Sequence, residues 1–191
     1  MRLTKIDVAE AHLVTAVRGT FRGEHPASIY LLAASAREIL TTIGIKTNVR
    51  TALHVLSEET GYKLSRLKEA AHQFAGFMKH ADKDADAALD RFTAADADIL
   101  LFIACNDFGI IAKGKPIELQ VYEAWWLATA HESISKAPLR SQHLIRGCIQ
   151  LFPGIRRANR AARQALGLAA LEKARLDDTL IMAIDREVHL P

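Results

Sequence analysis

Apolar residues recur along most of the chain at intervals of three and four, which is the spacing of one face of an α-helix. In the first such segment the apolar positions are Ile6, Ala9, Leu13, Val17 and Phe21. They predict a helix near residues 4–22 with Thr4 as its N-cap. No segment shows the alternating pattern of a β-strand. The pattern therefore predicts an all-α protein, a compact bundle of seven to nine helices with short connections.

Prolines, glycines and capping residues divide the rest of the chain into further helices. We expect these helices near residues 27–44, 49–60, 65–80, 93–112, 116–133, 138–152 and 155–186. Gly44 and Gly61 should end two of them, and Ser65 should cap the helix over 65–80. Thr93 and Asp96 have the spacing of a capping box.

The strongest break in the pattern is the dipeptide Pro153-Gly154. It predicts a helical domain over residues 1–152 and a basic C-terminal helical segment over 153–191 that packs on it. Half of the residues are apolar and a quarter are charged, which is typical of a globular protein. A chain of 191 residues is long enough to bury a core without a disulfide or a metal.

Several features of the sequence predict a cytoplasmic protein that does not enter a membrane. The longest unbroken apolar run covers residues 99–105, which is far shorter than the ~18 residues of a membrane span. The first ten residues include Asp7 and Glu10, where a signal peptide would be apolar. Cys105 and Cys148 lie in apolar stretches, and two buried thiols fit a reducing compartment.

Positive charge is concentrated in one part of the chain. Residues 1–135 carry 15 Lys and Arg against 17 Asp and Glu, whereas residues 136–175 carry nine basic residues against one acid, Glu172. We predict that Arg156, Arg160 and Arg163 share one stripe of the last helix, with Arg157 beside them, and that Arg140 and Arg146 lie on the preceding helix. Such a face can follow phosphate groups or bind an acidic protein.

A second candidate site contains histidine and carboxylate side chains, which are ligands of zinc and of non-haem iron. On one continuous helix over 65–80, Glu69, His72 and His80 would fall within a narrow stripe. These three residues are our candidate metal ligands. The alternative is that they form a solvated polar face.

Polar residues also occur inside apolar helices. Asp107 shares a helix face with Leu100 and Ile103, so it needs a hydrogen-bond partner if it is buried. Arg37 and Glu38 lie in a largely apolar helix, and we expect an internal ion pair there. In the pair Trp125-Trp126, we expect the rings to pack in the core.

Four motifs give the chain a resemblance to known proteins: His25-Pro26, Ala36-Arg-Glu-Ile-Leu40, Phe77-Met-Lys-His-Ala-Asp82 and Val121-Tyr-Glu-Ala-Trp-Trp126. Over roughly residues 3–130 it resembles a group of uncharacterised bacterial all-helical proteins. More distantly, it is similar to HEPN-type helical domains. Some of these are ribonucleases that use an Arg followed by a His four to six residues later, and this resemblance points to Arg66 and His72.

These observations lead to three hypotheses about function. The first is a binding module, similar to HEPN domains, that engages RNA or an acidic protein through the basic C-terminal face and needs no cofactor. The second is a helical-bundle enzyme with an iron or zinc ion held by Glu69, His72 and His80. The third is a structural homo-oligomer held by apolar helix faces. The sequence alone does not decide whether the protein is an enzyme.

Overall fold

The structure is a computed structural model that describes residues 2–79, 86–129 and 139–176. Within these ranges the chain forms nine α-helices and one short 3₁₀ helix, without a strand, and the all-α prediction is confirmed. The elements are α1 (Lys5–Arg22), α2 (Pro26–Thr47), α3 (Ala52–Thr60), α4 (Leu64–His72), α5 (Ala75–Lys79), α6 (Ala94–Ala112), α7 (Ile117–Thr129), α8 (Leu139–Leu151), η2 (Ile155–Arg157) and α9 (Arg160–Ala174).

The helices belong to two compact units, which we describe separately. Unit 1 comprises Met1–Ala16 and His25–Gly114, and unit 2 comprises Val17–Glu24 and Lys115–Pro191. Helix α1 therefore contributes its first turns to unit 1 and its last turns to unit 2. The domain boundary that we expected after residue 152 stays a prediction.

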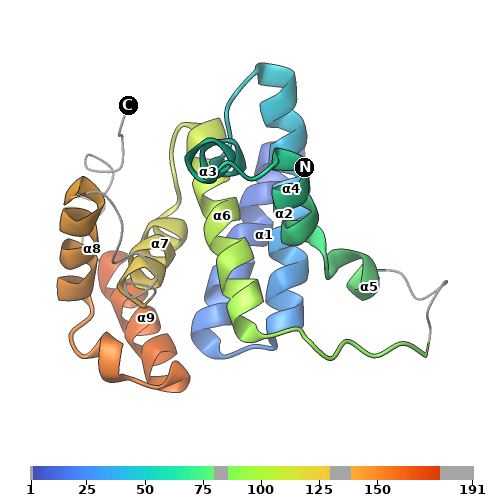
Figure 1. Ribbon diagram of the computed structural model, residues 1–191. Coiled ribbons are helices and arrows are strands. Elements are labelled where there is room, and N and C mark those ends of the chain that lie inside the picture. Colours follow the sequence, from blue (N-terminus) through green and yellow to red (C-terminus); the bar gives the residue numbers. More distant parts are fainter. Residues whose placement is uncertain (1, 80–85, 130–138, 177–191) are drawn as a thin grey trace. The chain divides into compact units, whose positions relative to one another are not determined.

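The core of unit 1 lies between α2 and α6, which run side by side (Figure 1). Helix α2 continues past Gly44 and ends at Thr47, with Asn48 as its C-cap in the left-handed conformation, at a φ of 54°. The prediction that Gly44 ends this helix is therefore wrong. The glycine has a packing role instead, because a Cβ atom there would lie 3.2 Å from Cγ2 of Thr51 and 3.3 Å from the carbonyl oxygen of Val49.

Among the described residues, α2 is the one helix long and apolar enough to cross a membrane. The central helix of a globular unit has the same length and hydropathy. Eight residues of α2 are buried, and Arg37 is one of them.

The helix predicted over residues 65–80 is divided into α4 and α5 by a turn at Gln73 and Phe74. The turn lets the Phe74 ring pack edge-on against the rings of Tyr30 and Phe92, with centroids 5.7 and 5.3 Å away. Helix α4 also begins earlier than expected, at Leu64, and its N-cap is Lys63 rather than Ser65. A single stripe through Glu69, His72 and His80 is therefore wrong, because the helix ends at His72.

Other predicted helix ends are confirmed. The Thr4 side chain accepts a hydrogen bond from the backbone N–H of Asp7 at the start of α1. Thr93 and Asp96 form the expected capping box of α6. Gly61 ends α3 with a φ of 73°, which favours glycine.

In unit 2, α7 packs against both α8 and α9 (Figure 1). Its core is aromatic: the Phe21 ring meets the Trp125 ring edge-on at 5.5 Å and lies 6.1 Å from the Tyr122 ring. Trp125 is buried, as expected, and Trp126 is half-buried. On α9, Gly167 leaves space for Phe21, since a Cβ atom there would lie 2.3 Å from the ring.

The helix predicted over 155–186 is not continuous. The chain forms η2 and then becomes extended at Ala158. Helix α9 begins at Arg160, and its N-cap is Asn159, whose side chain accepts a hydrogen bond from the N–H of Ala162. Helix α9 ends at Ala174, and residues 177–186 lie outside the described part of the chain.

Candidate functional site

Glu118, a buried acid of unit 2, is already engaged with arginines of the same unit. Its Oε1 accepts hydrogen bonds from Nη2 of Arg18 at 2.7 Å and from Nη2 of Arg175 at 2.5 Å. Burial raises the pKa of Glu118, but the hydrogen bonds from Arg175 and Arg18 outweigh it and lower the pKa overall. These contacts join the end of α9 to the start of α7 and stabilise unit 2.

A second acid of unit 2, Glu123, pairs with Lys115. The Lys115 Nζ lies 2.7 and 2.6 Å from the two carboxylate oxygens, and both side chains are about 10% exposed. Burial raises the pKa of Glu123, and the Lys115 ammonium opposes that shift. Glu118 and Glu123 are therefore already paired, Glu118 with Arg18 and Arg175 and Glu123 with Lys115.

Three arginines after α8 form what we call the arginine cluster: Arg156, Arg157 and Arg160. All three are exposed, and they fall within five residues of the chain, on η2 and at the start of α9. Arg146, on α8, is also exposed. Among residues 2–79, 86–129 and 139–176, no acidic group lies within ion-pair distance of Arg146, Arg156 or Arg157.

The predicted stripe of Arg156, Arg160 and Arg163 along one helix is wrong. Arg156 belongs to η2, not to α9. Arg163 turns inward: its Nε donates to the carbonyl oxygen of Ile155 at 3.1 Å, and its own carbonyl accepts from Nε1 of Trp125 at 2.7 Å. Arg163 is thus a structural residue. Of Arg140, only its position in α8 is described.

The arginine cluster lies beside the N-terminal end of α9, whose first turn contains no acidic residue. The free N–H groups of a helix give this end a partial positive charge, so an acid is favourable there and an arginine is not. Three arginines at this end therefore raise the local positive potential. An anion bound there would lower it.

Of the predicted metal ligands, the structure describes Glu69 and His72. Within the described residues, no group of three or more His, Cys, Asp and Glu side chains is placed to hold a metal ion. Glu69 is exposed, and His80 lies outside the described residues. The Nε2 atom of His72 lies 2.5 Å from Nη1 of Arg37, so this guanidinium occupies the Nε2 side of the ring.

Among the described residues of unit 1, Arg37 is the most deeply buried cation, with 1% of its surface exposed. Burial lowers its pKa, and the negative charge of Asp107 opposes that shift. The expected ion pair between Arg37 and Glu38 does not form, because Glu38 pairs with Lys79 at 3.3 Å. The direct partner of Arg37 is His72.

Asp107 is fully buried. Because it lies on an apolar face, it needs a hydrogen-bond partner. Its Oδ1 accepts from the backbone N–H of Ala52 at 2.6 Å, at the first residue of α3. Burial raises the pKa of Asp107 to about 6, against the effects of the Ala52 hydrogen bond and of Arg37. This carboxyl links α6 to α3.

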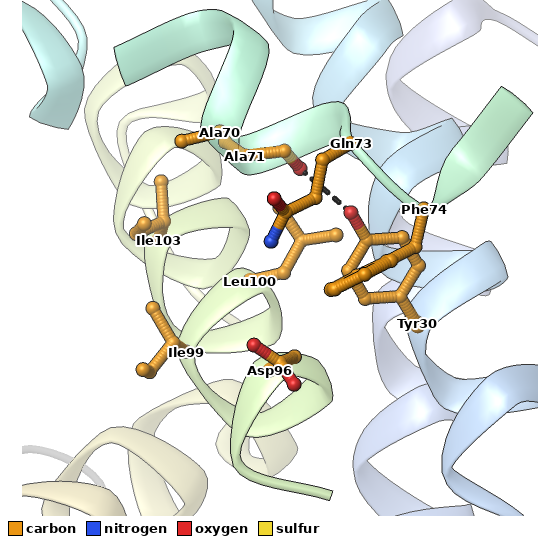
Figure 2. A pocket seen from close by; sticks show the side chains of 9 residues that line it. All are labelled: Tyr30, Ala70, Ala71, Gln73, Phe74, Asp96, Ile99, Leu100 and Ile103. Carbon is orange, nitrogen blue, oxygen red and sulfur yellow. Dashed lines mark hydrogen bonds between the residues drawn. The ribbon is translucent and has the colours of Figure 1, made fainter. Parts of the chain in front are cut away.

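A hollow of about 70 Å³ lies between α4 and α6 in unit 1 (Figure 2). Its walls are Ala70, Ala71, Gln73 and Phe74 on one side, Asp96, Ile99, Leu100 and Ile103 on the other, and Tyr30 of α2. The Tyr30 hydroxyl donates to the carbonyl oxygen of Ala71 at 3.1 Å. This volume accommodates a few water molecules, and it is smaller than the cavities that take drug-sized ligands.

In comparisons with known proteins, no protein-family model, no curated protein and no solved structure matches this chain. The resemblance to HEPN domains therefore stays a prediction. Arg66 is exposed on α4, whereas the arginine in contact with His72 is Arg37 of α2.

The contact between Arg37 and His72 was not predicted from the sequence. The two residues are 35 positions apart, so no local spacing connects them. The one signal was an arginine within an apolar helix, because a buried guanidinium needs polar partners from another segment.

Proposed function

We propose that unit 2 binds RNA through the arginine cluster. The observation that supports this proposal is the charge distribution: the described part of unit 2 contains eleven Lys and Arg residues and four Glu residues. Two of those glutamates, Glu118 and Glu123, are buried and paired with other bases. The excess positive charge therefore remains on the surface, as in a surface that neutralises phosphate groups.

The composition of the cluster indicates the kind of recognition. Arginine binds phosphate oxygens through two parallel hydrogen bonds. Arg156 and Arg157 are neighbours on η2, and Arg160 is the first residue of α9, so the three guanidinium groups can bind neighbouring phosphates. The sequence from 153 to 163 contains no aromatic residue on which a base could stack. We therefore propose binding through the sugar-phosphate backbone, with little preference for base sequence.

The test is the binding of a fluorescent single-stranded RNA of about 20 nucleotides, measured by anisotropy. In the variant, Arg156, Arg157 and Arg160 are changed to Glu. The matched control changes three exposed bases of unit 1, Lys5, Lys46 and Lys63, to Glu, so that both variants have the same net charge.

We expect the cluster variant to lose at least tenfold in affinity and the control to lose much less. Both variants change the net charge equally, but only the cluster variant removes the arginines that contact the phosphate groups of the RNA. Equal losses in the two variants, or no RNA binding by the parent protein, would contradict the proposal. Binding of polyglutamate but not RNA by the parent would assign the cluster to an acidic protein.

A further inference from the structure

Helices α4 and α5, residues 64–79, form an arm that is held on the rest of unit 1 by few contacts. Helix α4 has an apolar side and a polar side, yet none of its residues is fully buried. The contacts of the arm with α2 are made at the end of α4 and beyond, by Ala71, His72, Phe74 and Lys79. The arm thus depends on a small number of interactions, which is typical of a segment that opens locally.

Three polar contacts fasten the arm to α2. The Tyr30 hydroxyl donates to the Ala71 carbonyl at 3.1 Å, and Nζ of Lys79 lies 3.3 Å from Oε2 of the exposed Glu38. The shortest contact is between Nη1 of Arg37 and Nε2 of His72, at 2.5 Å. A guanidinium only donates, so Nε2 must accept and must carry no proton.

We propose that Arg37 and His72 form a proton-sensitive latch, which holds the arm on α2 at neutral pH and releases it in mild acid. Protonation of His72 removes the acceptor and places an imidazolium against a buried guanidinium. Two like charges at this distance repel each other strongly, because Arg37 has little access to water. The arm can relieve this repulsion by moving His72 into solvent.

The other charged groups around the latch are few. Burial and the Arg37 charge lower the pKa of His72, Glu38 opposes this shift, and Lys79 adds to it. Helix α3, which packs on α4, carries Glu58 and also His54, whose Nδ1 accepts from the N–H of Thr51 at 3.2 Å. On α6, Asp107 acts on Arg37.

The direction of the effect follows from the lowered pKa of His72. The open arm takes up a proton near the ordinary value of 6.5, whereas the closed arm resists protonation. The latch therefore contributes its full stability above pH 6.5 and loses it as the pH falls below that value. Asp107 acts in the opposite direction on the stability of unit 1, since its raised pKa favours the folded state as it becomes protonated.

Release of the arm has a structural consequence at the hollow. Ala70, Ala71, Gln73 and Phe74 form one wall of it, and they belong to the arm or to its turn (Figure 2). When the arm moves away, the buried side chains of Tyr30 and Leu100 on the opposite wall become exposed. Mild acid would thus uncover an apolar surface of unit 1, independently of RNA binding by unit 2.

The test is native-state hydrogen exchange of the full chain from about pH 7.5 to about pH 5, corrected for the intrinsic exchange rates. His72→Gln retains an acceptor for Arg37 but does not titrate. His143→Gln is the matched control, because His143 is exposed on α8 of unit 2. Asp107→Asn removes the second titrating group, so the effect of Asp107 on the pH dependence can be distinguished from that of His72.

We expect the amides of residues 64–79 to lose protection in acid in the parent, in His143→Gln and in Asp107→Asn, but not in His72→Gln. The pKa of His72, measured by NMR, sets the size of the loss. The ratio of closed to open arm should fall tenfold for each unit by which that pKa lies below 6.5. A pH response that is unchanged in His72→Gln, or no response in the parent, would overturn the proposal.

Discussion

Substitution of Gly167 by Ala should destabilise unit 2, although alanine is the better helix former. Gly167 lies inside α9, where a change from Gly to Ala normally contributes about 1 kcal/mol. Here the new Cβ atom would lie 2.3, 2.5 and 2.9 Å from three carbons of the Phe21 ring. The ring is buried and has Trp125 and Tyr122 as neighbours, so it cannot move aside freely.

Overpacking of a close-packed core costs typically about 1–3 kcal/mol, and contacts this short fall at the upper end of that range. After subtraction of the gain in helix propensity, we expect a net loss of about 2 kcal/mol. With a typical slope in urea, the midpoint of unfolding should fall by about 1 M. Tryptophan fluorescence reports on unit 2, because Trp125 and Trp126 are the two tryptophans of the chain and both lie in it.

Two further variants separate the clash from other effects. Gly147→Ala, in α8, adds a Cβ atom that would meet nothing within 4 Å, so it should leave unit 2 as stable or make it more stable. Phe21→Leu removes most of the ring, and it should make the added Gly167→Ala substitution nearly neutral. A Gly167→Ala protein as stable as the parent would refute the packing of Phe21 on α9.

Two other predictions concern an ion pair and a helix cap. The pKa of Glu118 is lowered in the folded state. The contribution of Glu118 to the stability of the protein is therefore fully present above pH 4.5, the ordinary pKa of this group, and is lost as the pH falls through its pKa in the folded state. Urea unfolding between about pH 7 and pH 3 should therefore show a larger loss of stability in the parent than in Glu118→Gln, and parallel curves would contradict this. Thr93→Ala removes the cap of α6 and should cost about 1 kcal/mol, as measured by urea unfolding followed by circular dichroism. Thr42→Ala, on the exposed side of α2, is the control and should cost nothing; an equal loss in both variants would contradict the role of the cap.

The helices were predictable because their signals are local. The spacing of apolar residues, the capping box at Thr93 and the glycine at 61 each act within a few residues, and the structure confirms them. The errors occurred where packing decides. Gly44 looked like the end of a helix, but it makes room for Val49 and Thr51, which follow the same helix. Gly167 likewise makes room for Phe21, which is far away in the sequence.

The candidate sites, like the helices, were predictable only where the signal is local in the sequence. The positive charge after residue 138 is visible in the composition, and the exposure of Arg156 and Arg157 agrees with it. The inward position of Arg163 was not predictable, because it depends on the 3₁₀ turn that presents the Ile155 carbonyl. The stripe with Glu69 and His72 required one continuous helix, and the packing of Phe74 on Tyr30 interrupts it.

The most direct test of the central proposal is the salt dependence of RNA affinity. The logarithm of the affinity for single-stranded RNA falls with the logarithm of salt concentration, with a slope of about −0.7 for each phosphate neutralised. In a variant with Arg156, Arg157 and Arg160 changed to Gln, we predict a slope shallower by about 2, because three contacts are removed. The same slope in the parent and in this variant would contradict the assignment of the arginine cluster as the RNA-binding surface.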